Sequence, residues 1–190
     1  MLKEYLLQTQ KNFLLKENIW ANSIFRDFIF LSCDKRGELG ELWFSKWINN
    51  ANLKVNEDKT NKNIKTKGHY DFMVNNKRIE IKTAYRGKTN TWQHENIYKK
   101  DVCDTNIFID VDIDCIYLSV VYRNEIPFEY NSFFGNRKKA TLRSGKIDGY
   151  KLDFSKVQIK LLMEKGRTLK INPNTTSDKD ISKFLEKLLN

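Results

Sequence analysis

Cysteine is scarce in this sequence, and long apolar runs are absent. The three cysteines, Cys33, Cys103 and Cys115, are odd in number and show no CxxC spacing, so neither a disulfide framework nor a zinc site is predicted. No segment approaches the roughly 20 consecutive apolar residues that span a bilayer. The N-terminus also lacks a cationic segment followed by an apolar block. We therefore expect a soluble, cytoplasmic protein with no membrane partner.

Length and composition fit one globular domain. The chain has 190 residues, of which 40% are hydrophobic and 31% are charged, which is enough for a full-sized core. We expect residues 1–190 to form a single domain. Within it we place a core at about 36–122, a basic segment at about 125–170 and a C-terminal helix at 177–190.

The formal net charge of +10 is concentrated in one part of the chain. Residues 137–170 hold 11 basic and 3 acidic residues, an excess of 8, whereas residues 1–136 hold 20 basic and 18 acidic residues, an excess of 2. A local basic excess is typical of a surface that follows phosphates, although lysine-rich tracts are also common on solvated faces. The distribution favours a polyanionic partner.

The stretch from His69 to Thr83 predicts a β-hairpin. Apolar and polar residues alternate on both sides of Asn75-Asn76, a dipeptide that tolerates the positive φ angles of a tight turn. With these two residues as the loop, residues whose numbers sum to 151 lie opposite each other, so Asp71 faces Glu80. One face then carries Tyr70, Phe72, Val74, Ile79 and Ile81, and the other carries His69, Asp71, Met73, Arg78, Glu80 and Lys82.

Two opposed carboxylates need a cation between them. At about 5 Å and an effective dielectric near 20 they repel by about 3 kcal/mol, whereas favourable cross-strand pairs return only about 0.2–1 kcal/mol. The cation is either Lys82 or a metal, and carboxylate and carbonyl oxygens suit Mg²⁺. Lys82 emerges on the same face as Glu80, where it could orient a water or offset charge on phosphorus. The alternative is a surface hairpin with a plain Glu80/Lys82 ion pair.

Asp71 followed by Glu80-Ile81-Lys82 resembles the D…(D/E)xK signature of the PD-(D/E)XK nuclease superfamily, the fold of most type II restriction endonucleases. Tyr70 replaces the usual proline before the aspartate. The resemblance implies an α/β fold with a mixed central sheet flanked by helices, N-terminal helices and a basic C-terminal extension.

The same resemblance implies a metal site. Asp71, Glu80 and the carbonyl of Ile81 would hold Mg²⁺, for which Mn²⁺ can substitute, and Lys82 would assist the attacking water.

The chain has only two histidines, His69 and His94, so an HNH or GIY-YIG type of nuclease is not supported.

The segment from Lys35 to Leu53 predicts a helix with Leu39, Leu42, Trp43, Trp47 and Ile48 on one side. The superfamily commonly has a glutamate on this helix, often in a G-x-x-(G/A)-E context, which the run Gly37-Glu38-Leu39-Gly40-Glu41 resembles. We therefore assign Glu41 as a third acidic ligand, acting directly or through water, with Glu38 as the fallback. Both are alternatively ordinary first-turn acids that complement the helix dipole.

After Lys82 we expect a basic turn at Arg86-Gly87-Lys88 and a helix from Thr91. Related nucleases often carry a glutamine on the helix after the ExK motif, close to the attacking water or the scissile phosphate, and Gln93 matches it. His94 would contact phosphate or act near the leaving group; the alternative is a structural hydrogen-bonding histidine.

Two strands are predicted at 106–111 and 115–122, the first nearly continuously apolar, as in a strand buried on both faces. Asp110, Asp112 and Asp114 alternate as in a calcium loop, but the glycine and closing glutamate of an EF-hand are missing, so we treat them as turn acids. The remaining predictions are helices at 2–17 and 23–31, a strand start and mobile loop at 52–67, strands at 150–154 and 157–162, and an amphipathic C-terminal helix.

Eight residues are predicted to contact DNA. Loop residues in a basic, glycine-containing context suit phosphate or base-edge contacts, and Arg143 could read guanine. The set is Arg86, Lys88, His94, Arg137, Lys138, Lys139, Arg143 and Lys146.

Together these patterns predict a Mg²⁺-dependent, sequence-specific endonuclease of double-stranded DNA, of the type II restriction kind. Because palindromic sites match two-fold protein symmetry, we expect a homodimer. One alternative is a repair, junction-resolving or phage recombination nuclease of the same fold, which would ignore sequence and, for a resolver, prefer branched DNA. Another is a catalytically silent DNA-binding protein, which predicts salt-sensitive binding without cleavage.

Overall fold

The computed structural model describes residues 3–9, 18–58, 60, 70–98, 102–129, 133–134, 140–144 and 149–190. Half of the segment predicted at 52–67 and the second half of the helix predicted at 2–17 lie outside the described residues, whereas residues 3–9 are helical. Also outside are His69 and four predicted DNA contacts: Arg137, Lys138, Lys139 and Lys146.

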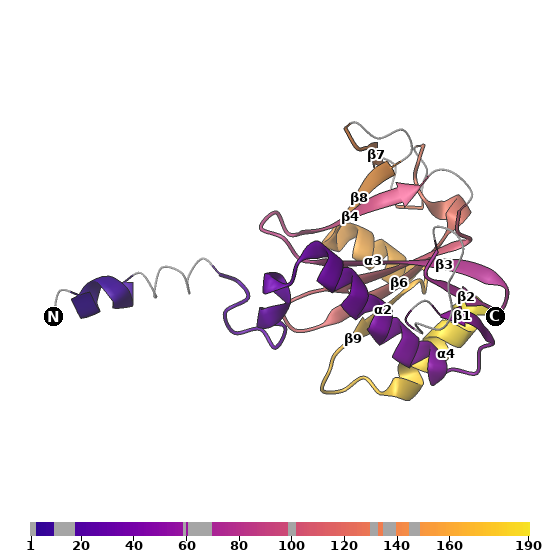
Figure 1. The fold of residues 1–190 in the computed structure, drawn as a ribbon, viewed down its shortest axis with the longest axis horizontal. Helices are drawn as coiled ribbons and strands as arrows, with labels where there is room; N and C mark the ends of the chain where they lie inside the picture. Colours follow the sequence, from indigo (N-terminus) through magenta and orange to yellow (C-terminus); the bar gives the residue numbers. More distant parts are fainter. Residues whose placement is uncertain are drawn as a thin grey trace.

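The protein is an α/β structure with a mixed six-stranded sheet in the order β1-β2-β3-β5-β6-β9 (Figure 1). Strands β3 and β5 run parallel, and the other neighbouring strands run antiparallel. The hairpin and the two strands at 106–111 and 115–122 are confirmed. The strands are β1 (Val55–Asp58), β2 (Phe72–Val74), β3 (Lys77–Tyr85), β5 (Thr105–Val111), β6 (Ile116–Tyr122) and β9 (Thr168–Ile171).

A second, three-stranded sheet has the order β4-β8-β7, with β4 (Thr91–Tyr98), β8 (Gly149–Ser155) and β7 (Thr141–Leu142). The helix predicted from Thr91 is therefore wrong, because this segment is strand β4. Its side chains alternate with period two: Trp92 and His94 are buried, and Gln93 between them is exposed. The strand predicted at 150–154 is confirmed within β8.

The helical elements are η1 (Arg26–Phe30), α2 (Cys33–Asn49), η2 (Arg123–Glu125), α3 (Lys156–Glu164) and α4 (Asp178–Leu189). The helix predicted at 23–31 reduces to the short 3₁₀ helix η1. The strand predicted at 157–162 is wrong because it lies in α3. There Ser155 and Gln158 form a reciprocal capping box that starts a helix, and Ile159 and Leu162, three residues apart, are buried. The C-terminal helix is confirmed as α4.

The large sheet is covered on both faces. On one face, α2 and α4 pack through Phe44, Ile48 and Leu185 against the odd-numbered residues of β3 and β5, such as Ile81. On the other face, the second sheet and α3 surround Phe108. Because side chains alternate along a strand, Glu80 and Lys82 project toward the second sheet.

Helix α2 buries a slightly different stripe from the one predicted. Trp47 and Ile48 are buried as expected, but Leu42 is 56% exposed, and Phe44 is fully buried in the core instead. The buried positions Gly40, Phe44 and Trp47 follow the four- and three-residue spacing of one helix face, from which Leu42 is turned away.

Among the described residues, no helix is long and apolar enough to cross a membrane.

Candidate active site

The hairpin of β2 and β3 has the predicted register. Phe72 pairs with Ile79 and Val74 with Lys77, so the paired numbers sum to 151. Asn75 and Asn76 have φ angles of 48° and 62°, as a two-residue turn requires. The five residues predicted to share the apolar face are all buried: Tyr70, Phe72, Val74, Ile79 and Ile81.

Asp71 lies in a bend at the point where the ladder between β2 and β3 stops. Its backbone N–H donates to the carbonyl of Ile79 at 2.8 Å, and its Oδ2 accepts the N–H of Ile81, also at 2.8 Å. The regular register therefore does not extend to an Asp71/Glu80 pair, but the Asp71 carboxylate still reaches the residue next to Glu80. Because the N–H and C=O of a strand residue point to the same side, the Ile81 carbonyl is directed to the side on which Asp71 lies.

Glu80 and Lys82 form an ion pair, so of the two cations that the sequence left open beside Glu80, Lys82 is present. Lys82 Nζ lies 2.5 Å from Glu80 Oε1, and the two side chains are only 14% and 16% exposed. Such a pair is screened little by solvent, so the ammonium offsets the carboxylate charge effectively. In this arrangement Lys82 supplies the cation beside Glu80, and a divalent ion must share that carboxylate with it.

Helix α2 approaches β3 at Gly40. A Cβ added to Gly40 would lie 1.8 Å from Thr83 Oγ1, so only glycine permits this approach. The approach places Glu41 beside β3, half-buried, whereas the exposed Glu38 is paired with Lys35 at 2.6 Å. Both glutamates line the cleft described below, so Glu41 stays the assigned acid and Glu38 the fallback.

Gly40→Ala is expected to lower the free energy of unfolding by about 1–3 kcal/mol, because the added methyl forces α2 away from Thr83. Urea denaturation measures the change. Gly37→Ala is the matched control, since its Cβ meets nothing within 4 Å and alanine favours the helix by about 1 kcal/mol. Thr83→Ala, which removes the obstructing hydroxyl, should restore part of the loss. Equal stability of Gly40→Ala and Gly37→Ala would contradict the close approach.

One cleft of about 650 Å³ collects all five residues predicted to be catalytic: Glu41, Asp71, Glu80, Lys82 and Gln93. They come from α2, the bend before β2, β3 and β4. Gln93 lines the cleft from a strand rather than from the predicted helix. The acidic side chains that line the cleft are Asp34, Glu38, Glu41, Asp71, Glu80 and Glu95, and the basic ones are Arg36 and Lys82, an excess of four negative charges.

This donor set suits a hard divalent cation, since it combines carboxylates with a backbone carbonyl. The ligand atoms of Glu41, Asp71 and Glu80 do not all lie within 4.8 Å of one another. Among the described residues the group that does is Asp112, Asp114 and Cys115. At least one of these three acids would therefore reach a shared metal through water rather than directly.

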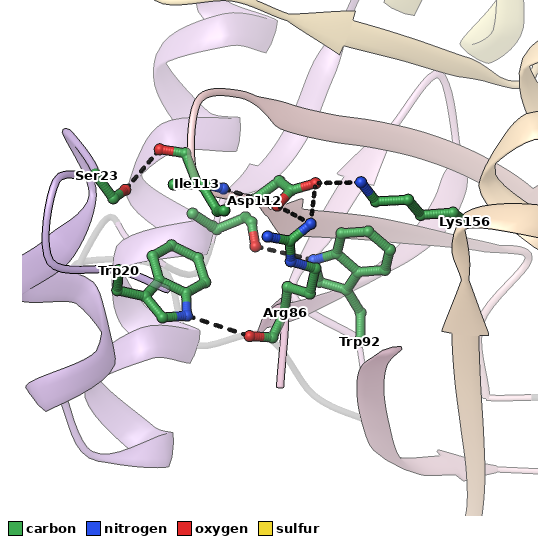
Figure 2. A network of polar contacts seen from close by, with 8 residues as sticks. Trp20, Ser23, Arg86, Trp92, Asp112, Ile113 and Lys156 are labelled. Carbon is green, nitrogen blue, oxygen red and sulfur yellow. Dashed lines mark hydrogen bonds and ion pairs between the residues drawn. The ribbon is translucent and has the colours of Figure 1, made fainter. Parts of the chain in front are cut away.

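Arg86 does not form the exposed basic turn that was predicted. Its side chain is buried, and its Nη1 lies 3.1 Å from Asp112 Oδ1, while Lys156 approaches the same carboxylate at 4.0 Å (Figure 2). Because the guanidinium is covered and neutralised, the prediction that Arg86 contacts DNA is withdrawn. Asp112 is correspondingly a buried ion-pair partner rather than a simple turn acid.

The Arg86–Asp112 pair belongs to a network that ties the ends of β3 and β5 to the segment before α2 (Figure 2). Trp20 Nε1 donates to the Arg86 carbonyl at 3.3 Å, and Ser23 Oγ donates to the Ile113 carbonyl at 2.6 Å. Trp92 Nε1 donates to the carbonyl of Val111 at 2.9 Å, which ties β4 to β5. Gly87 and Thr91, the chain neighbours of Arg86 and Trp92, line the cleft, so the network holds this part of its wall in place.

His94 is buried in the core and paired with Asp110. Its Nε2 lies 2.8 Å from Asp110 Oδ1, both side chains are 0% exposed, and its ring packs on Phe108 and Phe154. Burial raises the pKa of Asp110 above its usual range, and the imidazole of His94 opposes this shift. His94 lines the cleft but has 0% of its side chain exposed, which fits the structural alternative better than a contact to DNA.

Two other predicted DNA contacts are accessible. Lys88 is exposed, and Arg143 is partly exposed, with its Nη2 3.0 Å from Oε2 of Glu95, a residue that lines the cleft. Burial raises the pKa of the Cys103 thiol to about 11, and the negative charge of Glu80 adds to this shift. Cys103 is therefore not a thiolate at neutral pH.

The sequence reasoning missed two pairings: His94 with Asp110, and Arg86 with Asp112. A signal was present for the first, because an aspartate inside an otherwise apolar strand needs a buried partner, and the chain has only two histidines. For the second, no local pattern joins a residue after β3 to one after β5.

A scan against family models finds no matching family, and comparisons with curated proteins and with solved structures find no significant match.

Proposed function

We propose that the protein is a divalent-metal-dependent endonuclease that hydrolyses phosphodiester bonds in double-stranded DNA. One observation carries the proposal. The residues that resemble the PD-(D/E)XK signature, Asp71, Glu80 and Lys82, line a single cleft together with Glu41 and Gln93, although they come from four separate segments of the chain. A surface hairpin with an incidental ion pair gives no reason for Glu41 and Gln93 to be there.

Each residue has a distinct part in the proposed chemistry. Asp71, Glu80 and the Ile81 carbonyl would hold Mg²⁺, which supplies Lewis-acid stabilisation of charge on the phosphoryl group when bound. Lys82 orients the attacking water or offsets the growing charge, and Gln93 approaches the same position from β4. Glu41 would act as a further acidic ligand, directly or through water.

Charge supports a requirement for metal. The cleft carries four more negative than positive side chains, so a phosphate backbone is repelled unless a cation is bound there. The chain as a whole nevertheless has a net charge of +10, and basic side chains outside the cleft, such as Lys151, Lys156 and Lys160, are at least partly accessible. We infer that these attract the duplex while the metal site engages a single phosphate.

Within this proposal, the α/β fold is of the restriction-endonuclease kind. Its support is the order helix, hairpin and parallel strand in α2, β2–β3 and β5. The strand β4 replaces the helix expected between β3 and β5, which is the main departure. We further propose a sequence-specific type II activity by a homodimer. A mapped digest of DNA of known sequence distinguishes it, because a restriction enzyme gives discrete fragments and a branch-specific enzyme does not.

Plasmid cleavage tests the function. The native protein is expected to cut supercoiled plasmid with Mg²⁺ and not with a chelator. Asp71→Asn should cut at least about 100-fold more slowly, and it should still fold, because the amide oxygen can accept the N–H of Ile81. Glu164→Gln, which changes an exposed acid outside the cleft, is the control and should cut like the native protein.

If Asp71→Asn cuts as fast as the native protein, the site assignment is wrong. DNA binding that weakens with salt, without any cleavage in Mg²⁺ or Mn²⁺, would instead indicate a catalytically silent DNA-binding protein.

A further inference from the structure

Strand β4 contains a β-bulge at the rim of the cleft. His94 pairs with Leu152 and Ile97 with Tyr150, so three steps along β4 match two steps along β8. The extra residue is accommodated at Asn96, whose φ is 56°, a left-handed conformation that asparagine tolerates better than most residues. Bulges re-aim side chains next to functional sites. Here Glu95 and Asn96 are both exposed and both line the cleft.

Arg143 is fixed against this bulge. Its backbone N–H donates to the carbonyl of Gly149 at 2.9 Å, which anchors it beside the pairing of β7 with β8. Its Nη1 donates to Asn96 Oδ1 at 2.6 Å, and its Nη2 lies 3.0 Å from Glu95 Oε2. The side chain is nevertheless 32% exposed, and a guanidinium has five N–H donors, more than these two contacts use.

Stability gives little reason for this arrangement. Glu95 is 47% exposed, and accessible ion pairs typically contribute only about 0.2–1 kcal/mol. What the contacts do achieve is orientation, because a long side chain with many rotamers is held in one position before any ligand arrives. Such preorganisation lowers the entropic cost of binding.

We propose that Arg143, held by Glu95 and Asn96, is a specificity-determining residue that reads a guanine in the major groove of the substrate. The inference rests on the proposed function and adds a substrate feature to it. Arginine donates two parallel hydrogen bonds to O6 and N7 of guanine, the commonest base-specific contact in the major groove. The Arg143 partners Glu95 and Asn96 line the same cleft as Lys82, so one bound duplex meets both the base reader and the predicted catalytic residues.

The test uses oligonucleotide duplexes that carry the mapped cleavage site. At each guanine in turn, 7-deazaguanine replaces guanine and removes only the N7 acceptor. At one position the native protein is expected to cut the modified duplex about 10- to 100-fold more slowly. Arg143→Ala should cut the unmodified duplex more slowly than the native protein does and show no further loss at that position. In Glu95→Gln the loss of cleavage rate caused by 7-deazaguanine should lie between those of the native protein and of Arg143→Ala, because this substitution removes the charge that holds the guanidinium.

Arg26→Ala is the matched control, since this arginine is 67% exposed and does not line the cleft. Arg26→Ala should lose as much cleavage rate on the 7-deazaguanine duplex as the native protein does. The inference is overturned if Arg143→Ala responds to 7-deazaguanine as strongly as the native protein, or if no single position matters to the native protein. Absence of any cleavage by the native protein would overturn the proposed function itself, which is a distinct outcome.

Discussion

Lys82→Met is expected to reduce DNA cleavage by about 10²- to 10⁴-fold, the range for loss of a positioned acid–base or charge-stabilising group. Methionine keeps most of the aliphatic stem but removes the ammonium that lies 2.5 Å from Glu80. The packing of β3 should therefore survive, and only the charge is lost. Single-turnover cleavage of a plasmid in saturating Mg²⁺ measures the change.

The same substitution is expected to tighten Mg²⁺ binding by about tenfold, because a positive charge next to the metal ligands is removed. Isothermal titration without DNA measures this affinity. Opposite changes in metal affinity and in cleavage distinguish a residue that acts on the substrate from one that only supports the site. Lys183→Met, an exposed lysine on α4, is the control and should alter neither quantity. Weaker metal binding in Lys82→Met would contradict the competition between Lys82 and the ion.

His94→Phe is expected to lower the free energy of unfolding by about 3–5 kcal/mol, the usual cost of removing one partner of a buried pair. Phenylalanine fits the aromatic surroundings of Phe108 and Phe154, but it leaves the Asp110 carboxylate fully buried without a partner. Chemical denaturation at neutral pH measures the loss. Adding Asp110→Val should recover most of it, because an apolar pair of suitable volume costs little in a core.

The loss in His94→Phe should depend on pH. Burial raises the pKa of Asp110, and without His94 nothing opposes the shift. A carboxyl whose pKa is higher in the folded state is favoured when protonated, so the variant is least impaired below about pH 4, the pKa of the unfolded chain. Its stability relative to the His94→Phe/Asp110→Val double variant should fall as pH rises above that value. A loss that does not change with pH would mean that Asp110 is not the cause.

The parts of the fold that were predictable depend on residues close together in the chain. The β2–β3 hairpin follows from strict alternation around Asn75-Asn76, and α4 follows from Ser177, Asp180 and a regular apolar stripe. In both, the turn or cap chemistry and the periodicity agree, and no distant segment has to be known.

The error in β4 arose where a distant partner decides. In β4, the run of Trp92, Gln93 and His94 is too short for its period to distinguish a helix from a strand, and the deciding partner is β8, far along the chain. The strand predicted at 157–162 is wrong for a local reason, because the capping box of Ser155 and Gln158 starts helix α3 there.

The candidate site was predicted in its composition but not in its construction. The motif resemblance identified Asp71, Glu80, Lys82 and Glu41, and the cleft contains all of them. That Gly40 is required by the contact with Thr83 could not be inferred, since the distance between α2 and β3 is a tertiary quantity. The burial of Arg86 was equally inaccessible, because its partner Asp112 lies after the next strand of the sheet.

The pairing of β4 with β8 also has a consequence for synthesis on the ribosome. A nascent chain that has emerged as far as Tyr98 already carries every predicted metal ligand, yet Trp92 and His94 still lack the strand that holds them, because Leu152 and Phe154 are translated later. Since chains emerge from the N-terminus onward, one wall of the cleft is assembled only after residue 155. Translation products that end before β8 are thus expected to lack this wall of the cleft.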